Sequence, residues 1–298
     1  MSIYSQIAQN KVKTYLIMSL FTIIFTGFFY IIGKYFGGGS GSFYVILGFA
    51  ISFITSVYSY YNSDKLVLST TNARPATKEE FFDLYTVTEN LSIASGLPMP
   101  KVYVIDDPSP NAFATGRNPE HGVVCATTGL LRIMDRAELE GVIAHELSHI
   151  KNYDILVSTV TAVLVGTIAL VADWIMRSLW WGGSRDDDRP RHPAMLILLV
   201  VALIITPIVA TLIQLAVSRR REFLADASGA LLTRYPHGLA SALQKIAEYP
   251  KGVSSATTST AHLFISNPFK EKRVMSWMSN LFSTHPPVEQ RISILNKM

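Results

Sequence analysis

The chain has 298 residues, of which 49% are hydrophobic and only 16% are charged, and its formal net charge at pH 7 is +4. This composition is unusual for a wholly soluble protein and favours a soluble domain joined to a membrane part. The charge is modest and no basic stripe is interleaved with aromatic residues, so nucleic acid is not an expected partner. The single cysteine, Cys125, cannot form an internal disulfide, and its apolar surroundings predict a position in the core.

Residues 1–66 are predicted to form a transmembrane hairpin. Two uncharged runs, 15–33 and 43–61, are each about long enough to cross a bilayer core, and a glycine-rich turn joins them. The first run is too long for a typical signal-peptide core and is followed by no clean cleavage site, which favours a retained anchor. Basic residues flank both outer ends of the hairpin: Lys11, Lys13, Lys65, Arg74 and Lys78. This pattern predicts that the N-terminus and the domain that follows are cytoplasmic.

Residues 67–154 are predicted to form the first part of a soluble α+β domain. A helix is expected over 77–95, and short strands are expected over 101–106, 111–115 and 122–127. A helix with a metal-binding motif should follow directly. A strand that lies beside the cleft could pair with an extended peptide through its backbone.

The most informative stretch is His145-Glu146-Leu147-Ser148-His149. Two histidines four positions apart lie one turn apart on one face of a helix, which suits two nitrogen ligands of a single zinc ion. The glutamate between them can take the proton of a metal-bound water. Asp135 followed by Glu138 is typical of a capping box, and an apolar stripe at helical spacing runs from Leu139 to Ile150.

A zinc hydrolase needs a third protein ligand. The longer signature that would supply a third histidine is absent, because Asn152 and Ile155 stand where a glycine and a histidine are required. The third ligand must therefore come from elsewhere in the chain.

A second transmembrane hairpin is predicted over residues 155–218. Its two apolar runs, 155–176 and 194–217, are both long enough to span, and the polar loop between them is expected to be solvated. Arg219-Arg220-Arg221 marks the return to the cytoplasmic face, where basic residues anchor a span at lipid headgroups. Residues 219–298 are predicted to be the second part of the soluble domain.

Glu222 and Asp226 share a helix face directly after the fourth apolar run. A glutamate from a second helix is what a zinc site with two histidines and one glutamate requires. An aspartate one turn later can accept a hydrogen bond from a zinc-bound histidine. Such a pair is a common surface feature by itself. However, two spans return the chain to the side that it left, so both halves of the site should meet at one membrane face.

In these residues the chain resembles the M48 family of zinc metalloproteases and, within it, the HtpX-type membrane proteases of bacteria. The resemblance covers nearly the whole chain, including residues 111–113, 145–149, 221–226 and 284–286 and both pairs of spans. It implies an α+β, mainly α fold, with four transmembrane helices and a cytoplasmic zincin-like (gluzincin) protease domain. It also implies that His145, His149 and Glu222 bind one Zn²⁺ per chain and that Glu146 is the catalytic glutamate.

Two further positions have alternative interpretations. Asn111 could hold the substrate backbone or a neighbouring side chain at the edge of the cleft, or it could be an ordinary turn asparagine. His285 could enter the site and stabilise the oxyanion, or it could be a helix-cap or core histidine before Pro286.

The sequence therefore predicts a zinc metalloendopeptidase of the cell membrane, with both termini and the active site on the cytoplasmic side. The resemblance implies that its substrates are damaged or misassembled membrane proteins and unfolded polypeptides. Two alternatives remain open. An intramembrane zinc protease would carry the motif within an apolar span, whereas charged residues surround the motif here. A non-enzymatic zinc-binding membrane adaptor would not need Glu146.

Overall fold

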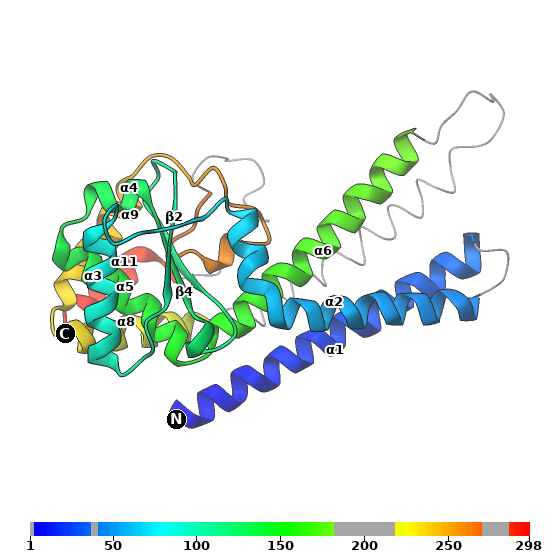
Figure 1. The fold of residues 1–298 in the computed structure, drawn as a ribbon, viewed down its shortest axis with the longest axis horizontal. Helices are drawn as coiled ribbons and strands as arrows, with labels where there is room; N and C mark the ends of the chain where they lie inside the picture. Colours follow the sequence, from blue (N-terminus) through cyan, green and yellow to red (C-terminus); the bar gives the residue numbers. More distant parts are fainter. Residues whose placement is uncertain (1–2, 37–40, 182–217, 270–285) are drawn as a thin grey trace.

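The computed structural model describes residues 3–36, 41–181, 218–269 and 286–298. Three long helices extend from one side of a rounded domain of shorter helices and strands (Figure 1). The long helices are α1 (Ile3–Phe36), α2 (Gly41–Thr70) and α6 (Asp154–Trp181). The C-terminus lies within the rounded domain.

Within the described residues, three helical segments are long and apolar enough to cross a membrane. These are Ser5–Ile31, Gly41–Thr70 and Asp154–Asp173. They contain most or all of the first three apolar runs predicted from the sequence. The fourth run, 194–217, and the polar loop before it lie outside the described residues.

Helices α1 and α2 pack closely because α2 presents small side chains to α1. Gly48 is one of them, and a Cβ atom added there would lie 2.5 Å from the Cβ atom of Phe29. Ser56 continues the same buried face, and its hydroxyl lies 3.4 Å from that of Thr22. Small residues that let helix backbones approach are the usual basis of helix association in a membrane.

The rounded domain contains a four-stranded sheet in the order β1-β2-β4-β3. The strands are β1 (Arg74–Pro75), β2 (Lys101–Ile105), β3 (Ala112–Thr115) and β4 (Val123–Thr127). β2 and β4 are parallel, whereas the β1–β2 and β3–β4 pairs are antiparallel. The three strands predicted from the sequence are confirmed, and the two-residue β1 was not predicted.

Six α-helices complete the described part of this domain, together with two short 3₁₀ helices, η1 (Pro119–His121) and η2 (Ala261–Leu263). The α-helices are α3 (Phe82–Ser95), α4 (Thr128–Ile133), α5 (Arg136–Lys151), α8 (Arg219–Thr233), α9 (Pro236–Glu248) and α11 (Val288–Leu295).

Two sequence predictions about helices were wrong in detail. α3 begins at Phe82 rather than at residue 77, because the Thr77 hydroxyl accepts the Glu80 N–H in a preceding turn. The metal-motif helix does not follow β4 directly. The short helix α4 intervenes, and the Thr127 side chain caps it by accepting the Leu130 N–H.

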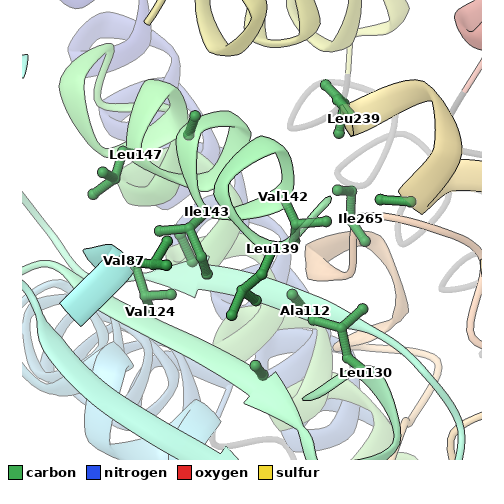
Figure 2. Packing of buried hydrophobic residues seen from close by; sticks show 14 of the residues in the cluster. Val87, Ala112, Val124, Leu130, Leu139, Val142, Ile143, Leu147, Leu239 and Ile265 are labelled. Atoms are coloured by element: carbon green, nitrogen blue, oxygen red, sulfur yellow. The ribbon is translucent and has the colours of Figure 1, made fainter. Parts of the chain in front are cut away.

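The motif helix α5 is the centre of the main core (Figure 2). The apolar stripe predicted from Leu139 to Ile150 is confirmed, since each of its members is at most 3% exposed: Leu139, Val142, Ile143, Leu147 and Ile150. They pack with side chains from the sheet, from α3 and from α9. A Cβ atom added to Gly141 would lie 2.6 Å from the backbone nitrogen of Leu239, so this glycine lets α9 approach α5.

Candidate metal centre

The local sequence explains where the motif helix begins and ends. The predicted capping box is confirmed, because Asp135 accepts the Glu138 N–H and Glu138 accepts the Asp135 N–H. The helix is capped at Asn152, and Tyr153 adopts a left-handed conformation with φ 59°. The next helix, α6, begins at Asp154. This break turns the first residue of a candidate membrane helix back towards His149.

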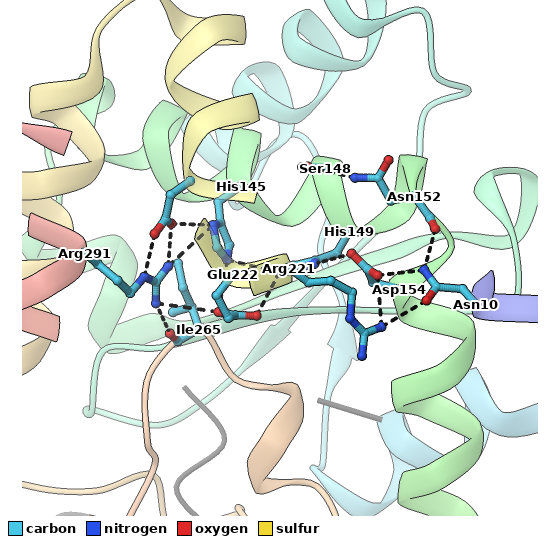
Figure 3. Close-up of polar contacts among 11 residues, drawn as sticks. Asn10, His145, Ser148, His149, Asn152, Asp154, Arg221, Glu222, Ile265 and Arg291 are labelled. Atoms are coloured by element: carbon cyan, nitrogen blue, oxygen red, sulfur yellow. Dashed lines mark hydrogen bonds and ion pairs between the residues drawn. The ribbon is translucent and has the colours of Figure 1, made fainter. Parts of the chain in front are cut away.

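Two histidines of α5 and one glutamate of α8 converge on one point (Figure 3). The Nε2 atoms of His145 and His149 are 3.2 Å apart. Glu222 places Oε1 3.5 Å from the Nε2 atom of His149 and Oε2 3.9 Å from that of His145. Donor atoms held at zinc-ligand distance around a tetrahedral ion lie roughly 3.4 Å apart, so this set fits a single zinc ion.

A close helix contact brings Glu222 to the histidines. A Cβ atom added to Gly229 would lie 3.1 Å from the backbone nitrogen of His145, which shows how near α8 runs to α5. The glycine thus lets a residue far along the chain contribute to the same site.

His145 is oriented by a buried ion pair. Its Nδ1 atom lies 2.9 Å from Oδ1 of Asp226, as the spacing from Glu222 led us to expect. Arg291 of α11 binds the same carboxylate through Nε at 2.8 Å and Nη2 at 2.6 Å, and it donates to the Ile265 carbonyl. Burial raises the pKa of Asp226, but Arg291 and His145 outweigh it and hold this pKa below its ordinary value.

His149 has a carboxylate partner of its own. Its Nδ1 atom lies 3.1 Å from Oδ2 of Asp154. The other oxygen, Oδ1, accepts hydrogen bonds from Arg221 at 3.1 Å and from Asn10 at 2.8 Å. Each histidine therefore turns Nε2 to the centre of the site while a carboxylate fixes its Nδ1 side, which is the usual arrangement around a metal-bound histidine.

The surroundings act differently on the two rings. Burial lowers the pKa of His145 below its ordinary value. Burial also acts to lower the pKa of His149, but Asp154 and Glu222 outweigh it and raise this pKa to about 9. The Nε2 atoms of the two rings face each other at 3.2 Å. A metal ion binds to a ring nitrogen that carries no proton.

Glu146 points into the same pocket but is not one of the three converging donors. It is 1% exposed, and burial, with help from Glu222, raises its pKa to about 7. Its Oε1 atom has no hydrogen-bond partner among the described residues. Because buried polar atoms in proteins normally have a partner, this oxygen is placed to bind a group that enters the pocket.

The pocket lies between the rounded domain and the first turns of α6. Its wall includes Ala114 of β3, Ile155 and Ser158 of α6, Arg221, and residues 262–265. His262 is one of these wall residues, and its ring nitrogen Nε2 lies 3.0 Å from the Ser158 carbonyl oxygen. A candidate membrane helix thus forms part of the wall of the pocket.

The described part of the site does not include Asn111. This residue is buried directly before β3, where its amide donates to the Ser266 carbonyl and its Oδ1 accepts the Ala112 N–H. It is not part of the pocket wall, and its role at the cleft edge remains a prediction. His285 lies outside the described residues.

Sequence reasoning missed three charged residues of the site. Asp154 carries no periodic signal, and Arg221 was interpreted as a lipid-headgroup anchor, which was wrong because it turns inward to Asp154. Arg291 had a usable signal. It stands between Val288 and Leu295, at the spacing of the apolar face of its helix, where a lone arginine indicates a buried partner.

Comparison with known proteins identifies the family to which the chain is similar. Residues 78–298 match the family model described as "Peptidase family M48". A "Protease HtpX homolog" of Dictyoglomus thermophilum is 49% identical over 295 residues, which cover 99% of this chain and 94% of that protein. A second "Protease HtpX homolog", from Caldanaerobacter subterraneus, is 44% identical. The alignment covers 100% of this chain and 98% of that protein.

One solved structure is similar in fold. The crystal structure of S. mikatae Ste24p matches with a TM-score of 0.50 and 17% identity, over 98% of this chain and 67% of that chain. At this identity the match supports the fold alone.

Proposed function

Because the chain belongs to peptidase family M48, we propose that it is a zinc-dependent endopeptidase that cleaves polypeptides at the cytoplasmic face of a cell membrane. The protein is a membrane metalloprotease. The proposal adds the metal, the residues that bind it, the side of the membrane and the class of substrate. It divides the chain into transmembrane hairpins at 1–66 and 155–218 and protease segments at 67–154 and 219–298.

The observation that carries the metal site is the convergence of three side chains, whose nearest nitrogen and oxygen atoms lie 3.2–3.9 Å apart. Two imidazoles and one carboxylate are a common ligand set for catalytic zinc, with one position left open. His145, His149 and Glu222 are the proposed ligands. When bound, zinc supplies a Lewis acid that activates water and polarises the peptide carbonyl.

The protein's own groups move the proton and hold the substrate. Glu146 takes the proton of the attacking water and delivers it to the nitrogen of the leaving amine. Its buried and unpartnered Oε1 atom is suited to this exchange. Ala114 places β3 in the wall of the pocket, so an extended peptide can lie along this strand and pair with its backbone.

The position of the pocket supports membrane-associated substrates. Aromatic and basic residues gather where the long helices meet the rounded domain, as they do at membrane–water interfaces. Tyr15 stacks on Tyr60, and the guanidinium of Arg117 lies 5.2 Å from the centre of the Tyr61 ring. The proposed substrates are unfolded or misassembled membrane proteins whose exposed segments reach this level.

A return span over residues 194–217 is part of the proposal. The 28 residues of α6 lead about 42 Å away from the pocket, yet Ser218 lies again in the pocket wall. A second crossing accounts for both facts and keeps Glu222 on the same side as the histidines.

Metal analysis and a cleavage assay on detergent-purified protein test the proposal. Glu146→Gln should retain zinc and lose cleavage of an unfolded membrane-protein substrate, whereas Glu222→Ala should lose the zinc itself. Cleavage that survives in Glu146→Gln, in a preparation free of other proteases, would refute the assigned role. A wild-type protein that binds zinc without any cleavage would favour the adaptor alternative.

A further inference from the structure

Asn10 of α1 is a buried polar residue near the N-terminal end of a candidate membrane helix, and both polar atoms of its side chain make hydrogen bonds (Figure 3). Its Nδ2 atom donates to Oδ1 of Asp154 at 2.8 Å and to the Asn152 carbonyl at 2.9 Å. Its Oδ1 atom accepts from Nη1 of Arg221 at 3.2 Å. Polar residues inside membrane helices are costly and commonly serve the function of the protein.

Each partner of Asn10 adjoins a residue of the metal centre. Asp154 binds Nδ1 of His149, Asn152 caps the motif helix, and Arg221 directly precedes Glu222. One side-chain amide therefore links the N-terminal helix to both helices that supply the metal ligands.

The junction between α5 and α6 needs such support. Tyr153 has φ 59°, a conformation that costs free energy for a residue with a side chain. Asn10 holds the residues on both sides of it through one NH₂ group. The next residue of α1, Lys11, places its Nζ atom 4.8 Å from the centre of the Tyr153 ring. Neighbouring residues of α1 thus contact all three residues of the junction.

The two histidines differ in how their carboxylate partners are held. Asp226 is bound by two nitrogen atoms of Arg291, which lies in the rounded domain. Asp154 instead depends on Asn10 of α1 and on Arg221 of α8. Among the residues that the structure describes, the His149 side of the site therefore depends on a candidate membrane helix that carries no proposed ligand.

We propose that Asn10 is a positioning residue for the metal centre, which fixes the ring of His149 through Asp154. The N-terminal helix is then part of the working site as well as an anchor. This inference rests on the proposed zinc site and goes beyond it, since it assigns a role to a residue more than 130 positions before the motif.

The test is zinc affinity of the full-length chain in detergent, measured by competition with a chelator. Asn10→Ala should weaken zinc binding about 10-fold, the lower end of the loss seen when outer partners of metal ligands are removed. Asn10→Asp keeps the shape of the side chain, loses both donated bonds and sets a second carboxylate against Asp154, so it should weaken binding further. The Asn10→Asp variant also provides the test if Asn10→Ala fails to fold.

Thr14→Val is the matched control. Thr14 is buried one turn further along α1, and its hydroxyl donates only within that helix, to the Asn10 carbonyl. This variant should bind zinc within about 2-fold of the wild type, because no partner of His149 is changed.

The route of the effect is tested in an Asp154→Asn background. If Asn10 acts through Asp154, adding Asn10→Ala to that variant should cause no further loss of zinc affinity. An equal loss in both backgrounds, or wild-type affinity in both Asn10 variants, would overturn the inference while leaving the proposed function intact. Failure of the wild type to bind zinc would instead overturn the proposed function.

Discussion

Variants of the buried ion pair between Arg291 and Asp226 should affect stability and zinc affinity in different ways. The first of these variants is Arg291→Met. Arg291 is 2% exposed, and its guanidinium neutralises Asp226 through two hydrogen bonds. Its Nη1 atom also lies 3.8 Å from Oε2 of Glu222. Methionine fills much of the space but leaves the buried carboxylate of Asp226 without its guanidinium partner.

The size of the effect follows from that burial. Removing one partner of a buried ion pair costs about 3–5 kcal/mol in free energy of unfolding. At about 2–4 °C per kcal/mol for a domain of this size, the midpoint of thermal unfolding of the metal-free protein should fall by about 6–20 °C. Arg136→Met is the control, because the ion pairs of Arg136 with Asp83 and Glu140 are at the surface. Its cost should stay below about 1 kcal/mol.

The double variant Asp226→Leu with Arg291→Met tests whether stability and zinc affinity change independently. It removes both charges, so the unfolding midpoint should return to near the wild-type value. Zinc affinity should nevertheless stay about 10–100-fold weaker, because His145 has lost the carboxylate that orients its ring. Recovery of zinc affinity together with stability would refute the assigned role of Asp226. An Arg291→Met midpoint equal to that of the Arg136→Met control would refute the energetic argument.

Two other predictions concern stability alone. Burial raises the pKa of Asp107, but hydrogen bonds from Ser254 outweigh it and hold the pKa below its ordinary value, so Asp107→Asn should lower the unfolding midpoint at pH 7. This loss should disappear as the pH falls through the lowered pKa of the folded state, and an equal loss at about pH 2 and pH 7 would contradict it. Gly141→Ala places a Cβ atom 2.6 Å from the backbone nitrogen of Leu239 and should cost about 1–3 kcal/mol. Gly166→Ala, whose nearest new contact is 3.5 Å away, should be neutral or stabilising, and equal midpoints for the two variants would show the reasoning to be wrong.

The features that could be predicted from the sequence are those that depend on residues close together in the chain. The capping box at Asp135, the apolar stripe of the motif helix and three of the four strands follow from residue spacing within a few positions. Glu222 was found in a different way. A metal site with two histidines lacks one donor, and the chain has an acidic pair directly after the fourth apolar run, where the predicted second hairpin would return it to the same side.

The features that escaped prediction depend on contacts between distant segments. Asp154 and Asn10 are 144 positions apart, and neither belongs to a periodic pattern that indicates its partner. The left-handed conformation of Tyr153 is set by the turn between two helices, and a tyrosine gives no local sign of it. The start of α3 was missed because helical propensity could not reveal that Thr77 begins a separate turn before the helix.

The proposed metal site lies at the junction between the candidate membrane helices and the rounded domain. His145 is held from within the rounded domain through Asp226, whereas His149 is held through Asp154, the first residue of a candidate membrane helix. Glu222 stands between the two halves, next to Arg221 in sequence and 3.8 Å from Arg291 in space. A metal ion held by all three ligands would therefore be sensitive to any shift of the domain relative to the membrane helices. Because ligand geometry tolerates only small displacements, peptide cleavage should depend on the position of the rounded domain relative to the long helices α1, α2 and α6.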